Sequence, residues 1–338
     1  MGASIRIESG PRFTRILGLG AYRPGRLVGN DEVAGPISSS DEWIRTRSGI
    51  RTRRWAGQEE ELLDMAEAAA RVALQRSEIA AEGIDCVVVA TISHFKQTPA
   101  AASELAHRIG ATGAGAFDVS AACAGFCYAL AMANDFVRGG SARTVLVVGA
   151  ERMMDMIDPT DRGTAFLFAD GAGAAVVGAS AQPGIGPVVW GGDGARSDAI
   201  AQERSWTRWR EELAEDPAAP YPPMRMNGQA VFRWATTSVA DVGRQAVTAA
   251  GLTLADLDAF IPHQANNRIT TAIAGSLGLA DRVVIARDLV DQGNTSGASI
   301  PLAMDTLLSS GQSASGDTAL LLGFGAGLSY AGQVIALP

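Results

Sequence analysis

Three polar residues whose types could do chemistry each follow an apolar run of the sequence. Cys123 lies in DVSAACAGF, His263 in FIPHQANNRI and Asn294 in QGNTSGAS. A cysteine thiolate is a strong nucleophile, and a histidine side chain can donate a hydrogen bond or exchange a proton near pH 7. In an open α/β sheet, ligands bind at the edge where the strands end. Because all three residues follow expected strands, we expect their side chains to converge on one pocket.

Cys123 is the candidate nucleophile. A short apolar run leads into it and an Ala-rich helical pattern follows, which predicts a strand-to-helix turn. The N–H groups and the dipole of the following helix favour the thiolate, and the small neighbours Ala122 and Ala124 leave room for a substrate. The alternative is that Cys123 is a small buried apolar residue, which is our interpretation of Cys127, about one helical turn later.

His263 and Asn294 also have structural alternatives. His263, one of three histidines, could exchange a proton near neutral pH, or it could be a satisfied polar residue at a loop edge. Asn294 precedes a helical pattern and could simply cap that helix. The polar run 264–266 beside an apolar strand favours a functional loop at His263.

The elements that position these residues follow the pattern of an α/β fold, in which short β-branched runs alternate with Ala-rich amphipathic stretches. The strand-like runs are Ile84–Ile92, Arg143–Val148, Ala174–Val177, Leu257–Ile261, Thr318–Gly323 and Val334–Leu337. The helix-like stretches are Glu60–Ser77, Gly125–Val137, Phe232–Ala250 and Ile300–Ser309.

The order of these features repeats along the chain. IDCVVVAT from Ile84 is echoed by LDAFIPHQ about 173 residues later, and RTVLVVGA is echoed by DTALLLGFG at a similar offset. Any two α/β units share some likeness, but a constant offset favours a duplicated unit, and we divide the chain into halves at 1–185 and 186–338. In this repeat Asn294 matches the position of Cys123 to within one residue.

One segment breaks the repeat. Residues 191–228 are polar, contain several prolines and carry Trp206 and Trp209. A long excursion of this kind is often a lid or a binding element, and the alternative is a plain surface insertion.

Composition and charge argue against several classes of protein. The chain has 338 residues, 47% of them hydrophobic, and a net charge of −8, which argues against a nucleic-acid binder. No run approaches the roughly 18 apolar residues of a membrane span, and residues 1–14 lack the pattern of a signal peptide. The cysteines, Cys86, Cys123 and Cys127, offer neither a disulfide framework nor zinc spacing. We therefore expect a cytoplasmic protein that needs no metal and does not associate with a membrane.

Six segments in one order resemble β-ketoacyl-[acyl-carrier-protein] synthase III of the thiolase superfamily. They are SSDEWIRTRSGIRTRRWA, DVSAACAGF, DPTDRGTAFLFADGAGAAVV, PHQANNRI, GNTSGASIPLA and GFGAGLSYAG. The resemblance implies a five-layered αβαβα thiolase-like fold made of two pseudo-duplicated halves, and a homodimer. It also implies an enzyme that initiates fatty acid synthesis from acyl-coenzyme A and malonyl-acyl carrier protein without a cofactor.

Carried over residue by residue, the resemblance implies catalytic roles. Cys123 accepts the acyl group from acyl-coenzyme A, and His263 and Asn294 stabilise the malonyl thioester oxygen as carbon dioxide leaves. The backbone N–H groups of Cys123 and Ala326 form an oxyanion hole for the attacked acyl thioester. Many relatives have glycine where this chain has Ala326, and a backbone donor survives that change.

The resemblance also implies binding positions. The coenzyme A positions are Trp43, Arg47, Arg162, Gln229 and Asn266. Gln229 stands where relatives often have asparagine, and Arg268 matches a carrier-protein docking position. Arginines crowded between positions 45 and 54 form a basic patch that suits phosphate and an acidic carrier protein.

Phe324 and Thr98 match positions of the primer pocket. In the family, the position of Thr98 reaches across the dimer to close the partner's acyl pocket, and relatives restricted to acetyl primers have phenylalanine there. Threonine is smaller, so we expect room for longer or branched acyl groups. The alternative is that Thr98 is an ordinary loop residue and other side chains close the pocket.

Three other functions compete with this interpretation. A priming ketosynthase or acyltransferase of a polyketide pathway is the nearest, but such relatives often lose the histidine or the asparagine, and this chain keeps both. A thiolase would need a second cysteine in the C-terminal half, and none lies beyond Cys127. A non-catalytic scaffold that binds carrier protein would not need to keep Cys123, His263 and Asn294 together.

Overall fold

Two five-stranded mixed sheets form the framework of the protein. The computed structural model describes residues 9–338, so residues 1–8 of the segment that was searched for a signal peptide lie outside it. The first sheet has the order β1 (Phe13–Tyr22), β7 (Asp170–Ser180), β6 (Thr144–Arg152), β4 (Cys86–Ala90) and β5 (Gly115–Val119). The second has the order β12 (Val284–Ile285), β11 (Ala259–Pro262), β13 (Thr318–Gly325), β14 (Ser329–Ala336) and β8 (Val189–Gly191).

The two sheets follow one plan. In the first, β4 pairs in parallel with β5 and β6, and β6 pairs antiparallel with β7. In the second, β11 pairs in parallel with β12 and β13, and β13 pairs antiparallel with β14. The duplicated α/β unit expected from the sequence repeat is therefore present in the pairing of the strands.

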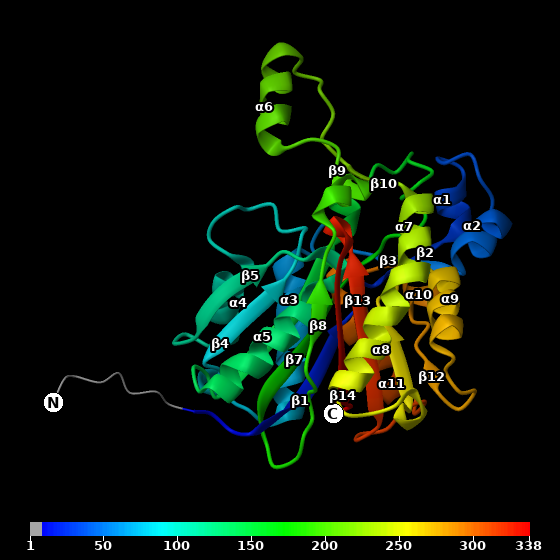
Figure 1. Cartoon of the computed structure of the whole chain (residues 1–338). Coiled ribbons are helices and arrows are strands. Elements are labelled where there is room, and N and C mark those ends of the chain that lie inside the picture. The colour runs from blue at the N-terminus through cyan, green and yellow to red at the C-terminus, as the bar shows by residue number, and fades with distance from the viewer. Residues whose placement is uncertain (1–8) are drawn as a thin grey trace.

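Helices form three layers around the sheets (Figure 1). The helices α5 (Gly125–Gly139) and α11 (Ser299–Ser309) lie between the two sheets. Outside the first sheet lie α3 (Leu62–Ser77) and α4 (Ala101–Ile109), and outside the second lie α8 (Ala240–Ala249) and α9 (Asn267–Leu277). The αβαβα layering and the fold class inferred from the sequence are confirmed.

Small side chains allow the central layer to be thin. Ala129 and Ala133 of α5 and Ala303 of α11 are fully buried between the sheets, where larger residues would push the layers apart. The helix α5 is followed by the C-cap residue Gly140, whose φ of 79° is the left-handed conformation that glycine adopts without steric cost.

Most elements lie where the sequence pattern places them, with shifts of a few residues at their ends. The stretch Phe232–Ala250 is an exception, because it divides into α7 (Gly228–Trp234), a π-helical turn (Ala235–Val239) and α8. The sequence analysis did not identify β1, α4 or α9. It also missed α2 (Asp41–Ser48), which Ser40 caps by accepting a hydrogen bond from Trp43 N at 3.2 Å.

The expected match between Asn294 and Cys123 is wrong by three residues. The short 3₁₀ turns Ala122–Ala124 and Ser296–Ala298 are the equivalent segments, each leading directly into a central helix. Both turns begin at a residue of positive φ, 45° at Ala122 and 47° at Ser296. Cys123 therefore corresponds to Gly297, while Asn294 precedes its turn. Alignment of sequence letters does not reveal this register, because the backbone turn sets it.

The excursion at 191–228 is a surface insertion at its tip and part of the cavity wall at its base. It contains a short hairpin of β9 (Ile200–Gln202) and β10 (Met224–Met226), with α6 (Trp206–Glu215) between the two strands. The helix α6 has no buried residue and stands away from the body of the molecule (Figure 1). The base of the hairpin, however, contributes Ile200, Met224 and Met226 to the wall of the main cavity.

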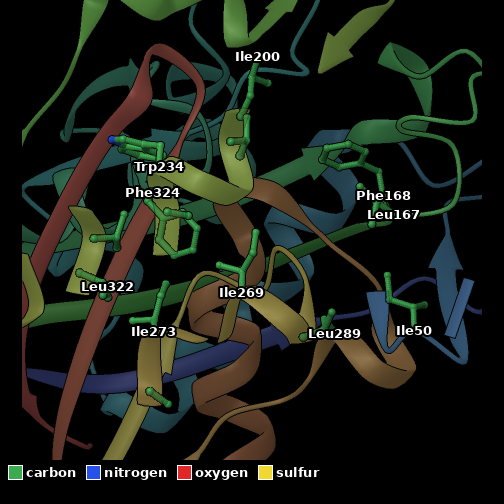
Figure 2. Packing of buried hydrophobic residues seen from close by; sticks show 14 of the residues in the cluster. Ile50, Leu167, Phe168, Ile200, Trp234, Ile269, Ile273, Leu289, Leu322 and Phe324 are labelled. Atoms are coloured by element: carbon green, nitrogen blue, oxygen red, sulfur yellow. The ribbon is translucent and has the colours of Figure 1, made fainter. Parts of the chain in front are cut away.

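The two halves share their hydrophobic cores. One cluster joins Ile50 and Phe168 of the first half with Trp234, Ile269 and Phe324 of the second (Figure 2). Another fills the layer between the sheets with residues of both halves. These shared clusters hold the two halves together around the cavity that lies between them.

Gly149 tests how closely the two halves must approach. A Cβ atom there would lie 2.4 Å from Gly297 O and 3.2 Å from Ala298 Cα, both backbone atoms of the turn before α11. Because backbone cannot shift cheaply, we expect Gly149→Ala to lower the free energy of unfolding by about 1–3 kcal/mol. Chemical denaturation measures this change. Gly113→Ala, with nothing within 4 Å of the added atom, should stay within about 0.5 kcal/mol of wild type, and equal stabilities for the two variants would contradict the prediction.

Candidate active site

A cavity of about 860 Å³ opens between the two halves. Its walls include nearly all of the residues that the sequence singled out, and they come from both halves of the chain. Those residues are Trp43, Arg47, Cys123, Arg162, Gln229, His263, Asn266, Arg268, Asn294, Phe324 and Ala326. The convergence expected for the cysteine, histidine and asparagine therefore occurs.

Cys123 lies in the turn between β5 and α5, two residues before the helix begins at Gly125. Its side chain is partly accessible, and its Sγ lies 3.5 Å from Ser296 Oγ. The preceding residue, Ala122, has the strained φ of 45°, which costs on the order of 1–3 kcal/mol for a non-glycine residue. Such strain persists where the surrounding structure fixes the backbone, as at the serine elbow of hydrolases.

The expectation that the helix start favours the Cys123 thiolate is not supported. Burial raises the pKa of Cys123 to about 12, the Ser296 hydrogen bond opposes this rise, and the negative charge of Glu151 adds to it. Desolvation dominates because a thiolate loses more hydration than the turn's dipoles return. At neutral pH the thiol form prevails in the free protein, and the attack therefore requires removal of a proton. Cys127, as expected, is fully buried, and burial raises its pKa to about 12 as well.

His263 follows the end of β11 and is 2% exposed. Its Nδ1 lies 2.8 Å from Ser299 Oγ, and Ser299 also accepts a hydrogen bond from Gln264 N at 3.3 Å. Burial lowers the pKa of His263 to about 3, so the imidazole is neutral at pH 7. When Ser299 donates its hydroxyl hydrogen to Nδ1, the Nε2 atom carries the proton and serves as a donor.

Asn294 is buried, at 4% exposure. Its side-chain Oδ1 accepts a hydrogen bond from Ser296 N at 2.9 Å. The amide oxygen is thus occupied, which directs the donor group Nδ2 to the cavity that Asn294 lines. Asn294 does not cap α11, whose N-cap residue is Ala298.

The loop before β7 holds Asn294 in place. Asn294 N donates to Leu167 O and Asn294 O accepts from Ala169 N, each at 2.9 Å. This loop is in turn held by two side chains of β3 (Thr52–Trp55): Arg53 donates to Phe166 O at 3.1 Å and Trp55 to Phe168 O at 3.2 Å. Arg53 is buried enough that desolvation lowers its pKa to about 10. A buried donor of this kind fixes the loop by satisfying its carbonyl groups.

Gly325 is the last residue of the second-half strand β13 and lies beside Cys123, and Ala326 follows it. A Cβ atom on Gly325 would meet Cys123 Cβ at 2.8 Å and Cys123 N at 3.0 Å. The close approach requires glycine at this position because no side chain fits between the two loops. It also places the backbone next to Ala326 in the same cavity wall as the nucleophile.

Basic and aromatic groups surround the mouth of the cavity. The guanidinium of Arg162 lies 4.7 Å from the ring centroid of Trp43, and that of Arg47 lies 5.7 Å from it. Arg268 lies 5.3 Å from the ring of Phe232, and Arg233 also lines the cavity. This rim is positive on a chain whose net charge is −8, and an anion is therefore attracted to it.

The side chain of Asn266 makes two hydrogen bonds to backbone groups at the rim of the cavity. Its Oδ1 accepts from Arg268 N, which caps α9, and its Nδ2 donates to Arg47 O, each at 2.9 Å. Gln229, the second residue of α7, is exposed and also lines the cavity. Asn266 therefore positions Arg47 and α9, and a direct contact between Asn266 and a ligand would have to replace one of these bonds.

The two residues expected at the primer pocket lie apart. Phe324 is 2% exposed, with its ring 5.4 Å from that of His263 and 6.3 Å from that of Trp234 (Figure 2). Thr98 is exposed and does not line the cavity of its own chain. Its loop also carries Phe95, which packs against the excursion at Trp206, with centroids 5.7 Å apart.

Comparison with known proteins agrees with this geometry. The family described as 3-oxoacyl-[acyl-carrier-protein (ACP)] synthase III matches residues 117–194, and its C-terminal counterpart matches residues 247–337. The β-ketoacyl-[acyl-carrier-protein] synthase III of Streptomyces glaucescens is 51% identical over 336 residues, covering 99% of this chain and 100% of that protein. The mycobacterial β-ketoacyl-[acyl-carrier-protein] synthase III of Mycobacterium avium is 51% identical over 334 residues, covering 99% and 98%.

The chain belongs to the β-ketoacyl-[acyl-carrier-protein] synthase III family.

Solved structures of the synthase III family share the fold. The priming β-ketosynthase from the R1128 polyketide biosynthetic pathway is 50% identical, with a TM-score of 0.95 over 99% of both chains. The 3-oxoacyl-[acyl-carrier-protein] synthase III of Aquifex aeolicus is 34% identical, with a TM-score of 0.86 over 96% of this chain and 99% of that one.

Within this synthase III site the sequence analysis overlooked three residues: Glu151, Ser296 and Gly325. Glu151 follows the apolar run of β6 as His263 follows that of β11, so the same signal, a polar residue at a strand end, could have found it. Ser296 stands two residues after Asn294 in a motif that we interpreted through its asparagine alone. Gly325 could be recognised only from its distance to Cys123.

Two searches of residues 9–338 complete the description of this synthase III chain. No group of three or more His, Cys, Asp or Glu side chains there is arranged to hold a metal ion. Within the same residues, no helix combines the length and the apolar character that crossing a membrane requires.

Gly325→Ala should block the nucleophile. The added methyl group would lie 3.1 Å from Cys123 Sγ, and a displacement of about 1 Å at a reacting atom can cost on the order of 10²-fold in rate. We therefore expect alkylation of Cys123 by iodoacetamide, followed by mass spectrometry, to slow by about 10- to 100-fold. Gly192→Ala, whose added atom meets nothing closer than 3.5 Å, is the control, and equal alkylation rates in both variants would contradict the assignment.

Proposed function

We propose that this protein, a β-ketoacyl-[acyl-carrier-protein] synthase III, works through Cys123, His263 and Asn294. The enzyme transfers an acyl group from acyl-coenzyme A to the cysteine and condenses it with malonyl-acyl carrier protein. The products are 3-oxoacyl-acyl carrier protein, coenzyme A and carbon dioxide, and the reaction initiates fatty acid synthesis. The observation that carries the proposal is that a thiol and two neutral hydrogen-bond donors open into one cavity between the halves.

In the first half-reaction, Cys123 Sγ attacks the thioester carbonyl of acyl-coenzyme A. The carbonyl oxygen becomes negative in the tetrahedral intermediate, and the N–H groups of Cys123 and Ala326 would stabilise it. Close contact between Gly325 and Cys123 supports this role, because it brings the two backbone segments together. Collapse of the intermediate releases coenzyme A and leaves the acyl group on Cys123.

In the second half-reaction, malonyl-acyl carrier protein loses carbon dioxide and becomes an enolate. His263 Nε2–H and Asn294 Nδ2–H would donate hydrogen bonds to the enolate oxygen. The low pKa of His263, about 3, supports this role, because the imidazole remains a neutral donor and transfers no proton to the enolate. The enolate carbon then attacks the acyl-Cys123 thioester to form the new carbon–carbon bond. Neither step calls for a metal or a cofactor.

The mouth of the cavity suits coenzyme A. Trp43 offers an aromatic face for the adenine, and Arg162 now occupies that face at stacking distance. An entering adenine would separate the two groups and be held between them. Arg47 would bind phosphate, and Gln229 and Asn266 flank the path to Cys123.

A carrier protein would dock on the same rim. Arg268 and Arg233 are exposed next to the cavity, and acidic carrier proteins are attracted by such a positive rim on an otherwise negative molecule. Their exposure supports docking of a carrier protein at the opening through which the malonyl group reaches Cys123.

A homodimer in the cytoplasm is the assembly that we propose. β5 is an edge strand of the first sheet and its residues are only partly covered, and such an edge calls for a partner or protection. Phe95 and Trp206 expose 45% and 41% of their surface beside the loop of Thr98. Three free thiols suit a reducing compartment.

A priming ketosynthase of a polyketide pathway is the second candidate. The structural match to the R1128 enzyme, with 50% identity and a TM-score of 0.95, favours it. Mass spectrometry of Cys123 after incubation with a panel of acyl-coenzyme A thioesters, followed by condensation with fatty acid and polyketide carrier proteins, separates the two candidates.

The catalytic roles predict that the two half-reactions can be separated by substitution. Cys123→Ala should abolish acylation without unfolding the protein, because alanine fits a turn already flanked by alanines. His263→Ala and Asn294→Ala should still acylate Cys123 but lose about 10²–10³-fold in malonyl decarboxylation, the cost of one lost donor. Mass spectrometry follows acylation and release of carbon dioxide follows decarboxylation. Variants that lose acylation and keep decarboxylation would reverse the proposed roles.

The small side chain of Thr98 leads to a prediction of which acyl-coenzyme A primers the enzyme accepts. If the partner's Thr98 closes the acyl pocket, isobutyryl- and butyryl-coenzyme A should acylate Cys123 at least as well as acetyl-coenzyme A, because each buried methylene contributes roughly 0.8 kcal/mol. Thr98→Phe should then reduce turnover of branched primers and spare acetyl, whereas Thr98→Ala should leave branched primers unaffected. Competition between acyl-coenzyme A thioesters measures the preference, and an unchanged preference in Thr98→Phe would refute the role of this residue.

A further inference from the structure

Glu151 is a buried carboxyl group that reaches the nucleophile through one intervening residue, and the two half-reactions above give it no role. It lies near the end of β6 and is 0% exposed. Its Oε2 accepts hydrogen bonds from Thr91 Oγ1, Ile92 N and Ser93 Oγ at 3.2, 3.2 and 2.6 Å. Its Oε1 accepts from Ser296 Oγ at 3.1 Å and from Gly297 N at 3.3 Å.

This set of donors fits the ionised form of Glu151. Two backbone N–H groups and three hydroxyl groups point at the two oxygens, and a carboxylate can accept from all of them. The backbone N–H groups can only donate, and one points at each oxygen, Ile92 N at Oε2 and Gly297 N at Oε1, which suits the ionised form. Burial raises the pKa of Glu151 while the hydrogen bonds oppose the rise, so its ionised form is a stronger base than an exposed carboxylate.

Ser296 connects this carboxylate to the nucleophile. Its hydroxyl donates to Glu151, and the same oxygen lies 3.5 Å from Cys123 Sγ, within reach of a thiol donor. Ser296 has a φ of 47°, a conformation that costs a non-glycine residue on the order of 1–3 kcal/mol. Glycine would adopt this backbone conformation without strain. The presence of serine is explained if its hydroxyl group takes part in the reaction.

We propose that Ser296 and Glu151 form a proton relay that removes the thiol hydrogen of Cys123 during acylation, an inference that rests on the proposed function. Ser296 Oγ accepts the S–H proton while its own O–H proton passes to Glu151 Oε1. The sulfur electron pair forms the bond to the acyl carbon, and the carbon–sulfur bond to coenzyme A breaks. The departing thiolate takes the proton back through Ser296 and leaves as the thiol. Ser296 touches the reacting sulfur, whereas Glu151 acts through it and is a positioning residue.

The relay solves an electrostatic problem. A thiol whose pKa lies near 12 is a poor nucleophile at neutral pH, and a second buried charge beside Glu151 would be costly. Transfer of the proton to Glu151 moves one negative charge from oxygen to sulfur and leaves the net charge of the buried group unchanged. His263 is a weaker candidate base, because its pKa is about 3 and its Nδ1 is bonded to Ser299.

Ser296→Ala and Glu151→Gln test the relay. General-base catalysis contributes about 10²–10⁴-fold, so each variant should acylate Cys123 at least about 10²-fold more slowly at saturating acyl-coenzyme A. The concentration that gives half of the maximal rate should stay unchanged, because neither residue binds coenzyme A. Once acylated by long incubation, both variants should condense with malonyl-acyl carrier protein at the wild-type rate. The double variant should be no slower than the slower single variant, because the two groups act as one unit.

Thr91→Val is the matched control. It removes another hydroxyl donor from the same carboxylate but lies off the path to Cys123, so acylation should change by less than about threefold. If Glu151 only braces the neighbouring loops, Thr91→Val and Glu151→Gln should instead slow acylation and condensation together. That result, or acylation of Ser296→Ala at the wild-type rate, overturns the relay.

Alkylation of Cys123 by iodoacetamide separates failure of the relay from failure of the proposed function. This reaction needs the thiol proton removed but no acyl-coenzyme A. Slow alkylation of Ser296→Ala and Glu151→Gln relative to wild type supports the relay even if wild type accepts no acyl-coenzyme A, which would refute the proposed function alone. Equal alkylation rates in wild type and both variants overturn the relay.

Discussion

Desolvation at the floor of the cavity sets the protonation state of every group that reacts there. It raises the pKa of Cys123 to about 12 and lowers that of His263 to about 3, so both are neutral at pH 7. A neutral imidazole suits a donor to an enolate, because it stabilises charge without transferring a proton. A neutral thiol, by contrast, needs a base, and the only carboxylate bonded to its hydrogen-bond partner in residues 9–338 is Glu151. The different roles proposed for His263, a neutral donor, and Cys123, a thiol that needs a base, thus follow from the burial of both groups.

The burial of these groups depends on how closely the two halves approach. The turn before α5 and the turn before α11 begin with matching strained residues, Ala122 and Ser296, and glycines allow them to meet. Gly325 of the second sheet has no side chain and leaves room for Cys123. Gly149 of the first sheet in the same way leaves room for the backbone of Gly297. A methyl group at either position would open the contact, and water could then enter and weaken every electrostatic interaction of the site.

Charge is separated between the floor and the mouth of the cavity. The buried neutral side chains of His263 and Asn294 line the cavity, whereas Arg47, Arg162 and Arg268 surround the opening of a chain with net charge −8. In the proposed reaction the phosphates of coenzyme A and an acidic carrier protein are attracted to this rim, while the acyl and malonyl thioesters reach past it to Cys123. The excursion at 191–228 takes part in this arrangement, because the base of its hairpin forms cavity wall while α6 stands outside it.

The sequence by itself determined the two-fold α/β plan and three of the candidate reacting groups. Hydrophobic periodicity is local, so β4, β6, β11 and β13 and the central helices could be located within a few residues, and the polar residues Cys123, His263 and Asn294 stood out at the ends of apolar runs. The tertiary structure decided what lies beyond local patterns: that Ser296 joins Cys123 to Glu151, that Gly325 touches the nucleophile, and that Cys123 corresponds to Gly297 and not to Asn294. It also reversed the expected effect on the Cys123 thiol, because a pKa depends on burial by residues far away in the chain, and no helix-start pattern reports how much water they exclude.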